Sequence, residues 1–204
     1  LKKKNIIDFH GSPIISYTIK AALKSNCFNR IVVSTDDKEI YRTALKFHHD
    51  VVYRPKFLAT DKSSIDDVCY NFLINESKNY NIEYDFLTVL YPTAPMRDFN
   101  DIIKVFNKLK FGSYTSTLAA TTFSLPVHQA LVYKKKYLKQ VFPKLYNLKQ
   151  NQVENFYVDN GSTYSTTVKN FIKKKNLITN RLGIYVMPPE KSIDIDTPFQ
   201  LELA

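Results

Sequence analysis

Cysteine is scarce in this chain, with only Cys27 and Cys69 among 204 residues. The two lack the spacing of metal ligands, so we expect them to pack in the core of a protein in a reducing cytoplasm. Long apolar runs are absent too, since none approaches the ~18 residues needed to span a bilayer. The first five residues lack the apolar centre of a signal peptide. These absences predict a cytoplasmic protein that does not act at a membrane.

Motifs of nucleophilic and acid–base chemistry are also missing. The sequence has no Ser-His-Asp order, no Cys-His pair near a glycine turn and no Walker sequence. Its four histidines are not spaced as zinc ligands. Catalysis by a histidine or a cysteine is therefore poorly supported.

Negative charge is in deficit, because 19 Asp and Glu residues stand against 29 Lys and Arg residues and leave a net charge of +10. Such a charge could attract nucleic acid, nucleotides or an anionic membrane. However, the lysines are spread widely, and the denser runs at 134–136 and 173–175 carry no aromatic or glycine-rich RNA-binding signature. Nucleic-acid binding is a weak alternative, which would require a steep salt dependence of oligonucleotide affinity.

Strand-like and helix-like segments alternate along the chain, which indicates a single domain over residues 1–204. We expect strands at 30–35, 50–53, 85–90, 114–120, 130–133, 164–167 and 183–187, and helices at 12–25, 36–47, 63–76, 98–108, 168–174 and from 198 onward. Ser12 is expected to cap the first helix, with Pro13 in its first turn. The pattern predicts an α/β fold with a mainly parallel sheet, helices on both faces, and ligands at the carboxyl ends of the strands.

The first predicted element is a helix, whereas a doubly wound fold usually opens with a strand and a phosphate-binding loop. The segment Lys2-Lys3-Lys4-Asn5 could be the end of such a loop. We therefore expect the first strand and most of the glycine- and serine-rich loop to be missing from this chain.

The segment Ser192-Ile193-Asp194-Ile195-Asp196-Thr197 is the most informative part of the sequence. In a strand, Asp194 and Asp196 would lie side by side on one face, with the isoleucines buried on the other. Adjacent carboxylates repel each other unless a cation holds them, and Mg²⁺ combines one or two carboxylates with waters and substrate phosphates. The pair thus suggests a nucleotide site. The alternative is a strand end before a Thr-Pro helix start, with Asp196 or Thr197 as the cap.

Three cations are candidates for contacts with an anion: Lys4, Arg54 and Arg97. Arg54 ends a predicted strand just before Pro55, which fixes its backbone. Without further evidence, a surface salt bridge is the more ordinary explanation of Arg54. Cations of this kind are what a triphosphate requires.

A helix start and a turn signal provide further candidates. Asp61, Ser63 and Ser64 surround a predicted helix start, whose N–H groups suit a phosphate unless they form an ordinary cap. Asn160-Gly161 indicates either a hairpin turn or a binding loop. Together with the cations and the acid pair, these features describe nucleotidyl transfer, which needs a phosphate cradle, Mg²⁺ and a positioned hydroxyl.

A set of short segments is specific in its order and distances. They are Lys4-Asn5-Ile6, residues 27–36, Arg54-Pro55 through Leu58-Ala59-Thr60-Asp61, Leu90-Tyr91-Pro92-Thr93-Ala94-Pro95-Met96-Arg97, Asn160-Gly161 with Tyr164, and residues 192–197. Through these segments, which extend over nearly the whole chain, the sequence resembles the acylneuraminate cytidylyltransferases, or CMP-sialic acid synthetases, with their relatives for pseudaminic and legionaminic acids.

The resemblance implies a Rossmann-like nucleotidyltransferase that transfers CMP from CTP to the anomeric hydroxyl of a nonulosonic acid and releases pyrophosphate. It implies that Asp194 and Asp196 are catalytic and hold Mg²⁺. It implies nucleotide contacts for Lys4, Asn5, Arg54, Ser63 and Ser64, and sugar contacts for Tyr91, Thr93, His128, Asn160, Gly161 and Tyr164. It also implies a homodimer, with a dimerisation excursion at about 134–160 that accounts for the irregular stretch 137–157.

Several positions depart from the family pattern. The family's phosphate loop is represented only by Lys4-Asn5, and its Arg-rich segment for the sugar carboxylate reads Gln150-Asn151-Gln152-Val153-Glu154. Tyr91 resembles the pseudaminic branch, whereas Asn160-Gly161 resembles the sialic and legionaminic branch, so the acceptor sugar stays open. Two alternatives follow: a catalytically weakened nucleotide-binding homologue, and a nucleotide-sugar glycosyltransferase that uses the Asp-Ile-Asp motif.

Overall fold

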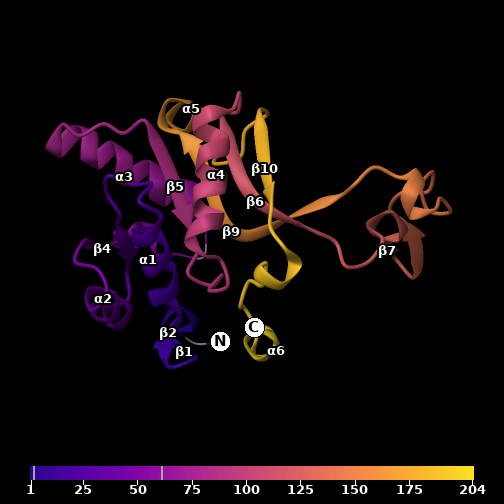
Figure 1. The fold of residues 1–204 in the computed structure, drawn as a ribbon, viewed down its shortest axis with the longest axis horizontal. Coiled ribbons are helices and arrows are strands. Elements are labelled where there is room, and N and C mark those ends of the chain that lie inside the picture. Colours follow the sequence, from indigo (N-terminus) through magenta and orange to yellow (C-terminus); the bar gives the residue numbers. More distant parts are fainter. Residues whose placement is uncertain (2, 61) are drawn as a thin grey trace.

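The computed structural model describes residues 1, 3–60 and 62–204. Two residues considered above, Lys2 and Asp61, lie outside the described residues. Within these ranges, strands and helices form an α/β fold around a four-stranded sheet and a smaller two-stranded sheet (Figure 1). The predicted α/β class is confirmed. Across the described residues, no helix is both long and apolar enough to cross a bilayer.

The observed elements agree in type with most of the predicted segments. The strands are β1 (Asp8–Phe9), β2 (Ser12–Pro13), β3 (Val33–Thr35), β4 (Val51–Tyr53), β5 (Phe86–Leu90), β6 (Ser116–Thr122), β7 (Leu131–Lys134), β8 (Tyr137–Gln140), β9 (Tyr157–Thr167) and β10 (Leu182–Val186). The helices are α1 (Ile14–Ser25), α2 (Lys38–Leu45), α3 (Ile65–Tyr80), α4 (Phe99–Phe111), α5 (Val168–Lys174) and α6 (Pro198–Leu203).

The amino-terminal segment folds back on itself before α1. Here β1 and β2 pair as an antiparallel hairpin, in which Ser12 pairs with Phe9. Gly11, with a φ of 79°, lies in the turn between them. The predicted cap at Ser12 is therefore wrong: Pro13 is the residue before α1, and it makes no side-chain hydrogen bond to the first turn.

The smaller sheet is a parallel pair formed by β3 and β4, with α2 as the connection between them. Asp37 caps α2, within a residue of the predicted helix start, because its carboxylate accepts hydrogen bonds from the backbone N–H groups of Glu39 and Ile40. Ile15 and Ile19 of α1 pack against Ala44 and Val51 in the core of this part of the molecule.

The larger sheet has the strand order β10-β6-β9-β5. β10 is parallel to β6, whereas β9 is antiparallel to both of its neighbours, β6 and β5. β5, β6 and β10 therefore point the same way, and the sheet is mixed rather than uniformly parallel. The cause is the excursion after β6, since the chain returns from it along β9 beside the strand that it left.

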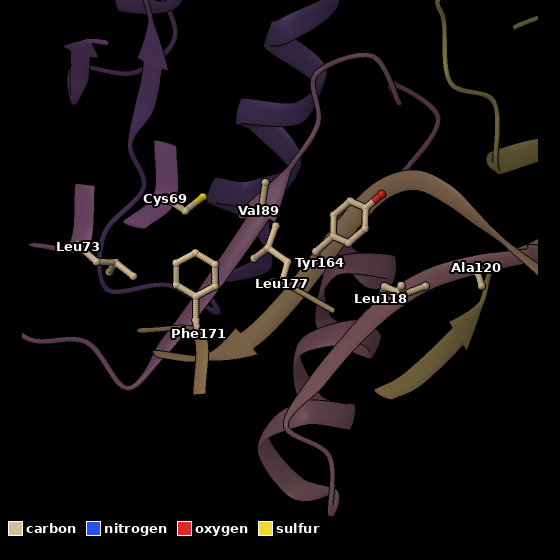
Figure 2. Packing of buried hydrophobic residues seen from close by; sticks show 8 residues of the cluster. All are labelled: Cys69, Leu73, Val89, Leu118, Ala120, Tyr164, Phe171 and Leu177. Carbon is tan, nitrogen blue, oxygen red and sulfur yellow. The ribbon is translucent and has the colours of Figure 1, made fainter. Parts of the chain in front are cut away.

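Helices cover both faces of the larger sheet, as predicted. Leu118 of β6 belongs to the same core cluster as Cys69 and Leu73 of α3 and Phe171 of α5, which covers one face (Figure 2). The next residue, Ala119, packs with Val105 of α4 on the other face. Successive side chains of a strand point to opposite faces, so this alternation places the sheet between two helical layers.

An arm projects from the body between β6 and β9 (Figure 1). It carries the antiparallel hairpin of β7 and β8, every residue of which is exposed. The predicted excursion at about 134–160 falls within this arm, and its part in dimerisation stays a prediction. Strand β8 was not predicted, because the lysine-rich residues around it lack a period, and the first half of β9 was not predicted either.

Candidate active site

A cavity of about 700 Å³ lies between β3 and β5. Both strands line it along their whole length. Within the described residues β3 pairs only with β4 and β5 pairs only with β9, so each strand has one unpaired edge. Polar residues line the cavity at both ends of these strands, and those at or beyond the carboxyl ends include Thr35, Asp36, Arg54 and Tyr91. This is the edge at which α/β sheets bind their ligands.

Two of the predicted nucleotide-binding residues, Asn5 and Arg54, line this cavity. The guanidinium of Arg54 donates one hydrogen bond to the carbonyl of Ser34 at 3.1 Å. The buried Nε of Arg54 and the buried Oδ1 of Asn5 have no hydrogen-bond partner among the described residues. Because buried polar atoms are nearly always paired, these two atoms are suited to bind polar groups of a ligand.

The segment with the acid pair is extended but forms no strand pairing within the described ranges. The predicted strand is therefore wrong. A single backbone hydrogen bond, from the N–H of Ile195 to the carbonyl of Thr93 at 2.8 Å, ties the segment to the loop after β5. The predicted burial alternation is present only in the second half of the motif: Ile195 is fully buried against Phe9 and Ile14 and Asp196 is exposed, whereas Ile193 and Asp194 are both half-buried.

The end of this segment caps α6. The hydroxyl of Thr197 accepts a hydrogen bond from the N–H of Gln200, whose side chain accepts one from the N–H of Thr197. This reciprocal pair confirms the cap considered from the sequence. A helix cap at Thr197 and a metal site at Asp194 and Asp196 are therefore compatible, and the cap does not exclude the metal site.

The two carboxylates have different surroundings. Asp196 is exposed and forms an ion pair with Lys4, 192 positions earlier in the chain. Asp194 is half-buried, and its Oδ1 finds no hydrogen-bond partner among the described residues. Burial raises the pKa of the Asp194 carboxyl, and the charges of Asp196 and Asp159 raise it further, while the Thr93 side chain and Lys4 act in the opposite direction.

Gly161 lies against the carboxylate of Asp194. A Cβ atom at this position would stand 2.8 Å from Oδ2 of Asp194, and the φ of 66° also favours glycine. The predicted hairpin turn at Asn160-Gly161 is wrong, since both residues lie inside β9. They occupy an irregularity where the register of β9 against β6 shifts between Leu118 and Ala120. This bulge brings the backbone of β9 close to the acid pair.

Asn160 ties the bulge to the segment that precedes Asp194. Its side-chain amide donates to Oγ of Ser192 at 3.0 Å, and its carbonyl oxygen accepts from the N–H of Ser162 at 3.2 Å. The side chain is buried. Its geometry is that of a residue which positions the site.

Two tyrosines and an aspartate form the side of the site next to Asp194. The rings of Tyr91 and Tyr164 have their centroids 5.5 Å apart. The hydroxyl of Tyr164 donates to both oxygens of Asp159, at 2.8 and 2.9 Å. Burial raises the pKa of Tyr91, and burial with the hydrogen bond to Asp159 raises that of Tyr164. Both phenols are therefore neutral donors at neutral pH.

Arg97 does not contact a ligand site, contrary to its prediction as an anion contact. Its side chain is almost fully buried and donates to the carbonyl of Ser162 at 2.8 Å, the carbonyl of Tyr91 at 3.3 Å and the hydroxyl of Thr18 at 2.6 Å. Burial lowers its pKa to about 10, which nearby Asp101 opposes. Arg97 thus joins α1, β9 and the loop after β5 around the site.

Three other predicted residues have local roles in the structure. Ser64 forms a capping box with Asp67 at the start of α3, which is the ordinary cap considered above. Ser63 bonds to Thr60 and to the carbonyl of Phe57 in the turn before this helix. His128 is buried in the segment leading to the arm, where Nε2 is 3.2 Å from the carbonyl of Leu148.

Asp159 was not among the residues predicted for the site. The only available signal was its position directly before Asn160-Gly161. Its role depends on the bulge in β9, which turns the carboxylate back toward Tyr164, and no periodicity of the sequence indicates such an irregularity.

The acid pair fits a divalent cation that also binds a ligand. Among the described residues, no group of three or more His, Cys, Asp and Glu side chains could hold a metal by itself. Mg²⁺ commonly uses only one or two carboxylates and takes its other ligands from water and phosphates. The unpartnered Oδ1 of Asp194 and the cation already paired with Asp196 agree with such a position.

The fold and the site together define a nucleotidyltransferase. The family model described as cytidylyltransferase matches residues 1–203, and the chain belongs to this family.

The chain is similar over its whole length to several named enzymes. It is 32% identical over 206 residues to the pseudaminic acid cytidylyltransferase of Campylobacter jejuni serotype O:2, and the match covers all of this chain and 88% of that protein. It is 31% identical over 208 residues to the CMP-N,N'-diacetyllegionaminic acid synthase of Legionella pneumophila, with the same coverage of 100% and 88%. It is 30% identical over 210 residues to the N-acylneuraminate cytidylyltransferase of Escherichia coli O18:K1:H7, with coverage of 100% and 48%.

Two solved structures share the fold. A CMP:2-keto-3-deoxy-manno-octonic acid synthetase complexed with CTP superimposes with a TM-score of 0.69 at 15% identity, over 99% of this chain and 90% of that chain. The 4-diphosphocytidyl-2C-methyl-D-erythritol synthase of Anaerococcus prevotii superimposes with a TM-score of 0.67 at 11% identity, over 98% and 90%. These likenesses support the α/β nucleotidyltransferase architecture.

Proposed function

We propose that this chain transfers CMP from CTP to the anomeric hydroxyl of a nonulosonic acid and releases pyrophosphate, with Mg²⁺ at the acid pair. The observation that carries the proposal is the placement of Lys4-Asn5. Asn5 lines the cavity beside Arg54, while the adjacent Lys4 pairs with Asp196. Groups for a nucleotide thus stand next to carboxylates for a metal. The names of the similar enzymes support a nonulosonic acid as the acceptor.

Each part of the site has a distinct task in this reaction. Asn5 and Arg54 orient the nucleotide, and Tyr91 offers a neutral donor to the sugar. Asp194 and Asp196 would hold Mg²⁺, which when bound neutralises charge on the phosphates. The sugar oxygen forms a bond to the α-phosphorus as the bond to the pyrophosphate oxygen breaks. Such a transfer depends on positioning and charge neutralisation more than on covalent catalysis.

The test is release of pyrophosphate from CTP in the presence of Mg²⁺ and, in separate reactions, pseudaminic, legionaminic and N-acetylneuraminic acids. We expect release with at least one of them and none without a sugar. Binding of CTP by calorimetry is measured in parallel. Binding without turnover would favour the weakened nucleotide-binding homologue, and absence of both would contradict the proposal.

The ion pair between Lys4 and Asp196 predicts competition between Lys4 and a metal ion. Lys4→Met should raise the affinity for Mn²⁺, measured by electron paramagnetic resonance without CTP, about two- to fivefold, because an exposed ion pair contributes up to about 1 kcal/mol. Lys3→Met is the matched control, since Lys3 pairs with Glu39 instead. Unchanged or weaker Mn²⁺ binding in Lys4→Met would count against a metal at Asp196.

We further propose that the arm joins two copies of this chain in a homodimer. Tyr133, Tyr137 and Leu138 of the hairpin are all more than half exposed, as is Leu125 before it. Clustered apolar side chains of this kind commonly mark an interface. A second copy of the chain is the partner that a symmetric dimer requires.

Leu138→Asp is expected to weaken the dimer at least about tenfold, because it places a charge at the centre of the apolar surface. Analytical ultracentrifugation over a concentration series measures this change. Phe111→Asp is the control, since Phe111 is also more than half exposed but lies at the end of α4. Identical masses for wild type and Leu138→Asp at every concentration would exclude the arm as the interface.

We also place the reaction in the cytoplasm. Both cysteines are free thiols, as is usual in a reducing compartment. Burial raises the pKa of Cys69 to about 12, so this thiol is inert in the core.

A further inference from the structure

Asp159 is a charged residue of the site without a task in the reaction described above. Its side chain is exposed, yet the carboxylate is fixed from two directions. The hydroxyl of Tyr164 donates to both of its oxygens, and the N–H of Gly161 donates to Oδ1 at 3.0 Å. An exposed carboxylate that served only for solubility would not need hydrogen bonds that fix its orientation.

The residue that holds Asp159 is itself anchored in the core. The ring of Tyr164 is 8% exposed and packs with Val89 and Leu118. Its hydroxyl points away from Phe171 and out of this cluster (Figure 2). Because Tyr164 is held by the core, its hydrogen bonds fix the position of the Asp159 carboxylate.

Asp159 lies near both the acid pair and Tyr91. Gly161, whose N–H binds Asp159, lies against the carboxylate of Asp194. The ring of Tyr91 adjoins that of Tyr164. The negative charge of Asp159 is also close enough to raise the pKa of both Tyr91 and Asp194. Asp159 is not among the residues that line the cavity with Asn5 and Arg54.

The chemistry of a carboxylate restricts what it can bind here. An ionised carboxylate accepts hydrogen bonds and donates none, and it offers about four lone-pair directions. The hydroxyl of Tyr164 and the N–H of Gly161 occupy only part of these lone-pair directions on Asp159, and the others are open toward solvent. A phosphate or a sugar carboxylate would be repelled, whereas hydroxyl and amide N–H groups would be bound.

We propose that Asp159 is a substrate-binding residue that accepts hydrogen bonds from hydroxyl or amide N–H groups of the acceptor sugar, with Tyr164 as its positioning residue. This inference rests on the proposed function and adds a determinant of acceptor choice. It also requires that the carboxylate of the sugar point away from Asp159.

The test compares KM for the sugar with KM for CTP. Asp159→Asn is expected to raise KM for the sugar about tenfold, as the loss of a hydrogen bond to a charged group does, with KM for CTP changed less than about twofold. Tyr164→Phe should raise KM for the sugar by a smaller factor, since it removes only the positioning. Asp8→Asn, which neutralises an exposed aspartate in β1, should change neither value.

A merely structural role would not alter the choice between acceptors. We therefore expect Asp159→Asn to change the ratio of kcat/KM between two sugars that differ by a hydroxyl and an acylamino group at one carbon. Asp159→Glu, which keeps the charge but moves it by one methylene, should also weaken sugar binding. Thermal melting checks that every variant is folded.

Sugar binding by calorimetry in the presence of CTP separates the possible failures. Pyrophosphate release by the wild type, with equal sugar affinity and equal acceptor ratios in Asp159→Asn and Asp159→Glu, would overturn the role of Asp159 and leave the proposed function intact. Sugar binding without turnover in the wild type would count against the proposed function, while the variants would still test Asp159. If the wild type binds no sugar, both proposals fail.

Discussion

Asp194→Asn should abolish nearly all nucleotidyl transfer while leaving the protein at least as stable as the wild type. The loss should be about a hundredfold or more in kcat/KM, because a metal that neutralises phosphate charge contributes several kcal/mol to transition-state stabilisation. Asparagine preserves the shape of the side chain but removes the charge that would hold Mg²⁺.

The stability half of this prediction follows from the surroundings of Asp194. Burial raises its folded-state pKa above the unfolded value. At neutral pH the ionised carboxyl therefore destabilises the fold, and this penalty disappears as the pH falls below the unfolded pKa. Asparagine carries no such penalty at any pH. A residue kept at a cost to stability is a common sign of function.

The measurements are pyrophosphate release and urea denaturation of the same preparations. Glu190→Gln is the matched control, since Glu190 is an exposed acid on the segment leading to Asp194. Turnover of Asp194→Asn within about twofold of the wild type would exclude the acid pair as the metal site. A large loss of stability would instead assign Asp194 a structural role.

Arg97→Met is expected to lower the free energy of unfolding by about 2–4 kcal/mol, since three buried acceptors lose a charged donor. The acceptors belong to Thr18, Tyr91 and Ser162, which lie in three separate parts of the fold. Methionine fills most of the volume but donates nothing. The change should therefore loosen the arrangement around the site as well as the global fold.

Urea denaturation measures this effect. Arg42→Met, on the exposed side of α2, is the matched control and should stay within about 0.5 kcal/mol of the wild type. Arg97→Lys should fall between the two, because one ammonium cannot reach all three acceptors in the geometry of a guanidinium. Equal stability of Arg97→Met and Arg42→Met would show that the buried guanidinium contributes nothing net.

Local signals predicted much of the fold correctly. Asp37 and Ser64 each cap a helix within a residue of the predicted start, because capping depends on residues close in sequence. Strands β3 and β5 were found because apolar residues follow one another there. The comparison with β9 is instructive: the missed part, from Tyr157 to Thr163, begins with three exposed residues and ends with Ser162 and Thr163, which are fully buried yet polar, so no apolar alternation marks it.

The site was predicted in part, and the missing part depends on contacts across the chain. The acid pair and Arg54 were candidates from residue type and position, and Asn5 was implied by the resemblance to the cytidylyltransferases. That Lys4 pairs with Asp196, and that Arg97 is buried rather than exposed to a ligand, follows only from packing between distant segments. Asp159 was not predicted as a site residue, because its orientation depends on the bulge in β9 and no periodicity of the sequence indicates that bulge.

The unpaired edges of β3 and β5 also affect how the protein unfolds. No ladder joins the sheet of β3 and β4 to the sheet of β5, β6, β9 and β10 within the described residues. Cooperative units of this kind can open separately, so amide exchange should protect the two halves to different degrees. Both edges offer free N–H and C=O groups to the same space, and an added strand could pair with both at once. Such a strand would join the two sheets into one continuous sheet.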